Sequence, residues 1–203
     1  ETSAYIFEDV TQKQKITASD RAREDNFGGR KSEDLRQGGG VGIYGDWAVV
    51  GAHADGSDKG AVYVYHRNNE VWQENSKLIP SDGWDYNEIG TQVAIHGDYF
   101  IVSAHRHSLT GHGREEGAAF IYHRSETNGT STWTEQAKLT ASDAGTYGRY
   151  AWFSNAVGLY GDYAIIGSPR WADSQFGGSN FSNRGAVYIF HRSETNWTEQ
   201  AKL

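Results

Sequence analysis

The chain has 203 residues, a formal net charge of −7, 13% aromatic residues, and 25 glycines against 2 prolines. This acidic balance argues against a broad electrostatic hold on nucleic acid, and no apolar run approaches the length of a membrane span. There is no Cys, so disulfides and thiolate sites are excluded. The many aromatic residues and glycines favour short strands joined by tight turns, and we expect one all-β domain over residues 1–203.

The N-terminal region contains two strings that recur more clearly later in the chain. They are "SAYIFED" at 3–9 and "QKQKITASD" at 12–20. Both match the second half of each later repeat, so residues 1–20 are predicted to supply the third and fourth strands of a unit whose first two strands are missing. Residues 21–37 are predicted to be a linker.

Three complete repeats follow, at 38–82, 83–143 and 144–203. Each begins with a short strand, a Gly-Asp turn and a second strand, as in "IYGDWAVVGAH" at 43–53, and continues with a third strand, as in "GAVYVYHR" at 60–67. The fourth strands lie in "VWQENSKLIPSD", "TWTEQAKLTASD" and "NWTEQAKL". We expect four antiparallel strands per unit, with the Gly-Asp turn closing the first hairpin. A string written once per unit indicates a repeated packing element rather than a catalytic site.

The strands of each unit are predicted to differ in how many of their faces are buried. The second and third strands are apolar on both faces and must be covered on both sides, whereas the fourth alternates, as in "WTEQAKL" at 133–139, and is typical of a half-exposed outer strand. Four-stranded sheets with this pattern are the blades of a β-propeller. The residues predicted to be almost wholly buried are Val49, Val62, Val64, Ile101, Phe120, Ile165, Val187 and Ile189. The tryptophans predicted to pack between blades are Trp72, Trp133 and Trp197.

The pattern "GDYAIIGS…GAVYIFHR…WTEQAKLTASD" resembles FG-GAP repeats, the blade unit of propellers related to the head of integrin α subunits, in their extracellular bacterial version. The Phe-Gly that names the family stands at Phe27-Gly28 and is matched by Ile89-Gly90. The resemblance implies three complete blades plus a half-blade at the N-terminus, in a partial or open propeller. It also implies a non-enzymatic scaffold or adhesion module at the cell surface or outside the cell. The expected partners are protein: neighbouring copies, as in a filament, or missing blades of the same propeller.

Two segments are candidate metal sites, although no cofactor is expected. Some FG-GAP blades bind calcium in a D-x-D-x-D-G loop, for which the turns here are too short. The substitute is "ADGSDKG" at 54–60, with Asp55 and Asp58, but a Gly-rich turn explains it better. His105 and His107, at i and i+2 in a loop, suit a transition metal if they point to one side, and are otherwise solvated. The recurring Asp46, Asp98 and Asp162 are interpreted as turn residues that bond their own backbone, and the recurring His66, His123 and His191 as packing or capping residues.

Sequons and loop tryptophans carry the remaining hypotheses. The candidate glycosylation sites are Asn128, Asn180 and Asn196, with chance occurrence as the alternative. Sugar faces stack on exposed aromatic rings, so a glycan-binding, lectin-like propeller is the alternative function. Its candidate residues lie outside the predicted strands and are Trp84, Trp152 and Trp171. A hydrolase is a third reading for which no residues can be named, because no nucleophile elbow or phosphate-binding Gly loop is present.

Overall fold

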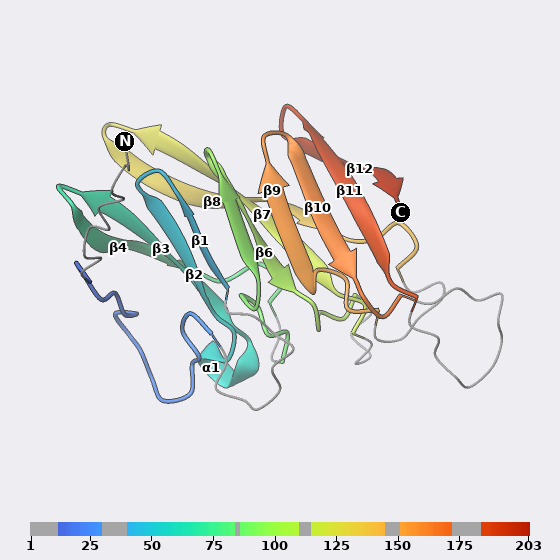
Figure 1. Cartoon of the computed structure of the whole chain (residues 1–203), viewed down its shortest axis with the longest axis horizontal. Helices are drawn as coiled ribbons and strands as arrows, with labels where there is room; N and C mark the ends of the chain where they lie inside the picture. Colours follow the sequence, from blue (N-terminus) through green and yellow to red (C-terminus); the bar gives the residue numbers. More distant parts are fainter. Residues whose placement is uncertain (1–11, 30–39, 84–85, 110–114, 145–150, 172–183) are drawn as a thin grey trace, which may run out of the picture.

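The computed structural model describes residues 12–29, 40–83, 86–109, 115–144, 151–171 and 184–203. The strands in these parts form three four-stranded antiparallel sheets that stand side by side (Figure 1). Within each sheet the strands are ordered as they follow one another in the chain. The prediction of an all-β chain built from propeller blades is confirmed.

Each sheet lies inside one of the predicted repeat ranges. The first sheet contains β1 (Val41–Tyr44), β2 (Trp47–Ala52), β3 (Ala61–Asn68) and β4 (Val71–Leu78). The second contains β5 (Val93–His96), β6 (Tyr99–Ala104), β7 (Ala118–Thr127) and β8 (Thr130–Leu139). The third contains β9 (Ala156–Tyr160), β10 (Tyr163–Ser168), β11 (Ala186–Ser193) and β12 (Asn196–Lys202). The short element α1 (Asp55–Asp58) has positive φ at Gly56 and Ser57, so it is a tight turn rather than a regular helix.

The Gly-Asp turn closes the first hairpin of every sheet, as predicted. In the first sheet Tyr44 pairs with Trp47 across two residues, and Gly45 has φ 57°. A glycine with positive φ at the first turn position is typical of a type II′ hairpin turn, which matches the twist of the flanking strands. The fourth strand also has a bulge at the same place in each sheet: its pairing with the third strand skips one residue, opposite Val64, Ile121 and Ile189.

The sheets pack face to face, with their first strands nearest one another: β5 contacts both β1 and β9. At the turn end of these strands His96 lies between two tyrosines, with ring centroids 4.8 Å from Tyr44 and 4.6 Å from Tyr160. One apolar cluster fills the space between the first and second sheets, and another fills the space between the second and third.

Burial follows the predicted pattern in two sheets and departs from it in the third. The predictions for Val49, Val62, Val64, Ile101 and Phe120 are confirmed, since each is 0% exposed. The prediction for Ile165 is wrong because it is 50% exposed, and Val187 and Ile189 are only partly buried. These three side chains lie on the face of the third sheet that points away from the second, where no sheet of the described residues covers them. Trp133 is buried between the first and second sheets, whereas Trp72 and Trp197 are partly buried.

Residues 12–29 cover the outward face of the first sheet. Ile16 and Phe27 pack there, and the Phe27 ring lies 5.5 Å from the Tyr63 ring. No strand is assigned over 12–20, where a fourth strand was expected, because the contact with β4 is made by a side chain: Gln14 bonds both the N–H and the C=O of Trp72. The strand expected at 3–9 lies outside the described residues.

The glycine before the third strand allows the connection to the next sheet to pass close by. A Cβ on Gly60 would lie 2.2 Å from the Ile89 carbonyl oxygen, and one on Gly117 would lie 2.2 Å from that of Phe153. Any larger residue would push the connection away from the sheet, which explains the recurring Gly-Ala before this strand.

Candidate docking site at the blade faces

Each connection between sheets carries a Ser-Asp pair that binds the outer strand of the next sheet. The Ser81 backbone N–H and hydroxyl both donate to the Glu135 carboxylate on β8, at 2.7 and 2.8 Å. The other two pairs of this kind are Ser142 with Glu199 and Ser19 with Glu74. The Ser of "ASD" and the Glu of "TEQAKL" are therefore two halves of one contact between neighbouring blades.

The aspartate of each Ser-Asp pair binds a lysine on the same outer strand. Asp143 accepts bonds from Lys202, from the Tyr188 hydroxyl at 2.8 Å and from Trp171 Nε1 at 2.9 Å. Burial opposes ionisation of Asp143, but these donors outweigh it and hold the pKa of the carboxyl below its ordinary value. The equivalent ion pairs are Asp82 with Lys138 and Asp20 with Lys77.

An arginine at the end of each third strand is fixed to the Gly-Asp turn of its own sheet. Arg67 donates its backbone N–H to the Asp46 carbonyl at 2.8 Å and its guanidinium to the Asp46 carboxylate at 2.6 Å. The equivalent ion pairs are Arg124 with Asp98 and Arg192 with Asp162. The interpretation of these aspartates as bonding their own backbone was incomplete, because their carboxylates hold arginines. The signal for this was the recurrence of His-Arg wherever Gly-Asp recurs.

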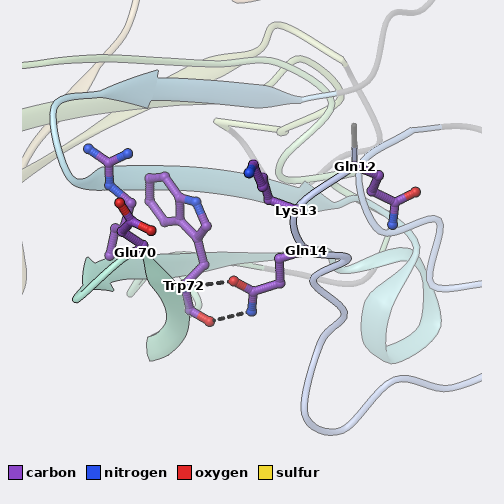
Figure 2. A pocket seen from close by; sticks show the side chains of 6 residues that line it. Gln12, Lys13, Gln14, Glu70 and Trp72 are labelled. Carbon is purple, nitrogen blue, oxygen red and sulfur yellow. Dashed lines mark hydrogen bonds between the residues drawn. The ribbon is translucent and has the colours of Figure 1, made fainter. Parts of the chain in front are cut away.

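A pocket of about 480 Å³ opens beside the outer hairpin of the first sheet. It is lined by Gln12, Lys13, Gln14, Arg67, Glu70 and Trp72. Figure 2 shows the Trp72 indole standing along one side and Gln14 bonded to the Trp72 backbone below it. The Arg67 guanidinium lies 5.6 Å from the Trp72 ring, so a cation and an aromatic face are both presented to the pocket.

An apolar hollow of about 490 Å³ lies at the other end of the molecule, on the outward face of the third sheet. Tyr160 is 76% exposed there and Ile165 is 50% exposed. The remaining lining residues are Gly158, Leu159, Tyr163, Ala164 and Ile189. The outward face of the third sheet thus exposes a surface of the kind that the inner faces bury, whereas residues 12–29 cover the outward face of the first sheet.

The residues predicted to bind metal contact other side chains of the protein. Asp55 is buried and accepts bonds from Lys77 at 2.7 Å and from the Tyr63 hydroxyl at 3.0 Å, contacts that Asp58 does not share. His105 lies 3.2 Å from Thr91 Oγ1. Across the described ranges, no three His, Asp or Glu side chains are grouped as a metal ion would require.

His107 belongs to a network of its own, between two blades. Its Nδ1 lies 3.0 Å from Asn87 Nδ2, and its Nε2 lies 2.8 Å from Lys138 Nζ. Burial and the neighbouring Lys138 charge lower the pKa of His107 to about 4, so the ring is neutral at pH 7 and accepts a hydrogen bond from one of these partners.

The rings of the two loop tryptophans that the structure describes are each in contact with a cationic side chain. Arg170 lies 3.3 Å from the Trp152 ring centroid, and Trp152 Nε1 donates to Glu115. Lys202 lies 3.4 Å from the ring centroid of Trp171. Trp84 lies outside the described residues. The recurring histidines pack as interpreted: His66 stacks on Trp47, whereas His123 and His191 pack at a tilt against Tyr99 and Tyr163.

Two of the three sequons are described, and both are exposed. Asn128 lies in the turn between β7 and β8, and Asn196 is the first residue of β12. Asn180 lies outside the described residues.

The FG-GAP repeat model matches residues 10–65, 72–122 and 133–190. The segment 72–122 runs from β4 of the first sheet to β7 of the second. One family repeat therefore includes parts of two neighbouring blades and the Ser-Asp connection between them. A comparison with curated proteins finds no match. In the part of the chain that the structure describes, no helix has the length and apolar character to cross a membrane. Because the family model covers most of the chain and each sheet has the blade architecture, the chain belongs to the FG-GAP repeat family.

Proposed function

We propose that this protein is a non-enzymatic scaffold or adhesion module, outside the cell or at its surface, that works by docking blade against blade. The observation that carries the proposal is the outward face of the third sheet. Ile165 stands where Val49 and Ile101 stand in the other two sheets, and those two residues are fully covered by the next blade. The third sheet therefore presents half of an interface that occurs twice inside the molecule.

The occupant that fits this face is a further blade of the same type, from the same propeller or from a neighbouring copy. Fully burying an Ile side chain contributes about 1.5–3 kcal/mol, so covering the exposed half of Ile165 with parts of Tyr160 and Tyr163 favours association. Exposed apolar surface on a sheet face with a polar rim is typical of a protein-binding site. Exposed sequons at Asn128 and Asn196 support the extracellular location.

Sedimentation velocity over a range of concentrations tests the docking role. We expect the wild-type chain to associate and Ile165→Glu to weaken the association, because a buried carboxylate has no partner in this face. Ile79→Glu is the matched control, since Ile79 is 44% exposed but lies in the connection after β4, away from both hollows. A strictly monomeric wild type, or equal weakening by both variants, would contradict the proposal.

Glycan binding remains a prediction without a specific observation in its favour. The faces of Trp152 and Trp171 that a sugar would need are stacked against Arg170 and Lys202. A ligand would first have to displace these cations, and Lys202 is also paired with the Asp143 carboxylate.

A further inference from the structure

We propose that the pocket between Arg67 and Trp72 binds an aromatic side chain of a partner, at the position that directly follows a Gly-Asp turn in a β-hairpin. This inference rests on the proposed docking function and names the chemistry of the partner for the first blade. Two equivalent pockets inside the molecule already hold such a side chain.

The pocket of the second sheet holds Trp47. This residue follows Gly45-Asp46 and belongs to the preceding sheet. The Arg124 guanidinium lies 5.0 Å from its ring, and the Trp133 ring meets it edge-on at 5.6 Å between centroids. A guanidinium over the face and an indole at the edge is a favourable arrangement for an electron-rich ring.

The pocket of the third sheet repeats this arrangement with a different aromatic residue. Tyr99 follows Gly97-Asp98 in the second sheet. Arg192 lies 4.3 Å from its ring, and the Trp197 ring meets it edge-on at 6.2 Å. The pocket therefore accepts either Tyr or Trp, and its constant parts are the arginine and the tryptophan of the receiving sheet.

Arg67 and Trp72 are the same pair on the first sheet. Arg67 aligns with Trp72 across β3 and β4, as Arg124 does with Trp133 and Arg192 with Trp197. The backbone bond from the arginine to the turn aspartate is 2.8 Å in all three sheets, so Arg67 is already held in the receiving position. Its side chain is 46% exposed, against 22% for Arg124 and 21% for Arg192, and its guanidinium lies over its own Trp72 instead of a neighbour's ring.

The rim of the pocket favours a hairpin over a free aromatic molecule. Lys13 and Gln14 lie on one side and Glu70 on the other, so polar groups surround the apolar centre (Figure 2). In the third sheet a rim group of this kind is used: Trp197 Nε1 donates to Gln136 of the preceding blade at 3.1 Å. A hairpin brings its ring in a fixed orientation together with backbone groups for the rim, and such preorganisation lowers the cost of binding.

The probe is a backbone-cyclised, fluorescently labelled peptide of residues 156–168, the β9–β10 hairpin with its Gly-Asp-Tyr sequence, titrated with the full 203-residue chain by fluorescence anisotropy. We expect saturable binding that Arg67→Ala and Trp72→Ala in the protein, and Tyr163→Ala in the peptide, each weaken by about tenfold. Arg67→Lys should weaken binding less than Arg67→Ala, because the charge remains while the planar guanidinium is lost.

Arg124→Ala is the matched control. Its pocket is already filled by Trp47, so this variant should lower the thermal midpoint and leave peptide binding unchanged. Circular dichroism establishes that each variant is folded, and Arg67 is exposed enough for its replacement to leave the fold intact. No saturable binding, binding unaffected by Arg67→Ala or by the peptide Tyr163→Ala change, or equal competition by N-acetyl-tyrosinamide would overturn the inference. The docking function is measured separately through Ile165, so association that Ile165→Glu weakens would survive failure of this peptide.

Discussion

Replacement of Trp133 tests directly whether packing between blades stabilises the fold. The side chain is 3% exposed, and its ring meets Trp47 of the first sheet at 5.6 Å and Phe100 at 5.0 Å between centroids. Truncating a buried Trp to Ala costs about 3–5 kcal/mol of unfolding free energy. Trp133 Nε1 is buried without a hydrogen-bond partner, and such a group itself costs about 1–3 kcal/mol. We therefore expect Trp133→Ala to cost about 3 kcal/mol, the lower end of the range.

Two further variants separate the ring contacts from the indole N–H. Trp133→Phe retains most of the ring contact and removes the unsatisfied donor, so its cost should be within about 1 kcal/mol. Trp72→Ala, in the partly exposed equivalent position, should cost about 1–2 kcal/mol. Urea unfolding followed by far-UV circular dichroism measures all three. If Trp133→Phe were as costly as Trp133→Ala, or Trp72→Ala costlier than either, the account of the blade interface would be wrong.

Two other properties follow from single residues. The pKa of His107 is about 4 in the folded chain and 6.5 ordinarily, so the unfolded chain binds more protons and the wild type should lose stability as the pH falls from 6.5 towards 4. His107→Gln should flatten this part of a plot of thermal midpoint against pH, and an unchanged slope would contradict the assignment. In a source that glycosylates its proteins, we expect glycans at one or more of Asn128, Asn180 and Asn196, with Asn180 first because its predicted loop is the longest; mass spectrometry before and after deglycosylation measures this, and an unmodified mass would remove the prediction.

The blade architecture could be predicted from the sequence because its signals are local. A Gly-Asp turn between two short strands, two apolar strands and an alternating outer strand determine a four-stranded sheet without reference to anything distant. Burial of the third sheet could not be predicted in the same way. Val49, Ile101 and Ile165 occupy equivalent positions in near-identical strands, and they differ only in whether another sheet lies against them.

The polar contacts of the site were missed for a related reason. Asp46 was assigned to its own turn because a short-range bond is the simplest use of a turn aspartate. Its partner Arg67 lies 21 residues later in the chain, at the end of β3. In the sequence, only the joint recurrence of Gly-Asp and His-Arg connects the two residues. His105 and His107 were placed together as i and i+2 neighbours, but the loop directs one to Thr91 and the other to Lys138, which no spacing rule anticipates.

The recurrence of "TEQAKL" and "ASD" is explained by the contacts between neighbouring blades. Ser142 belongs to the repeat at 83–143, whereas its partner Glu199 belongs to the repeat at 144–203. The two partners of each contact therefore lie in consecutive repeats. In each blade the Glu and Lys of the outer strand bind the Ser and Asp of the connection that precedes the blade. In a stack where each repeat contacts only its neighbours, this requirement is the same at every interface. Identical interfaces call for identical strings, and the third blade therefore presents an outward face like those that the other two blades bury.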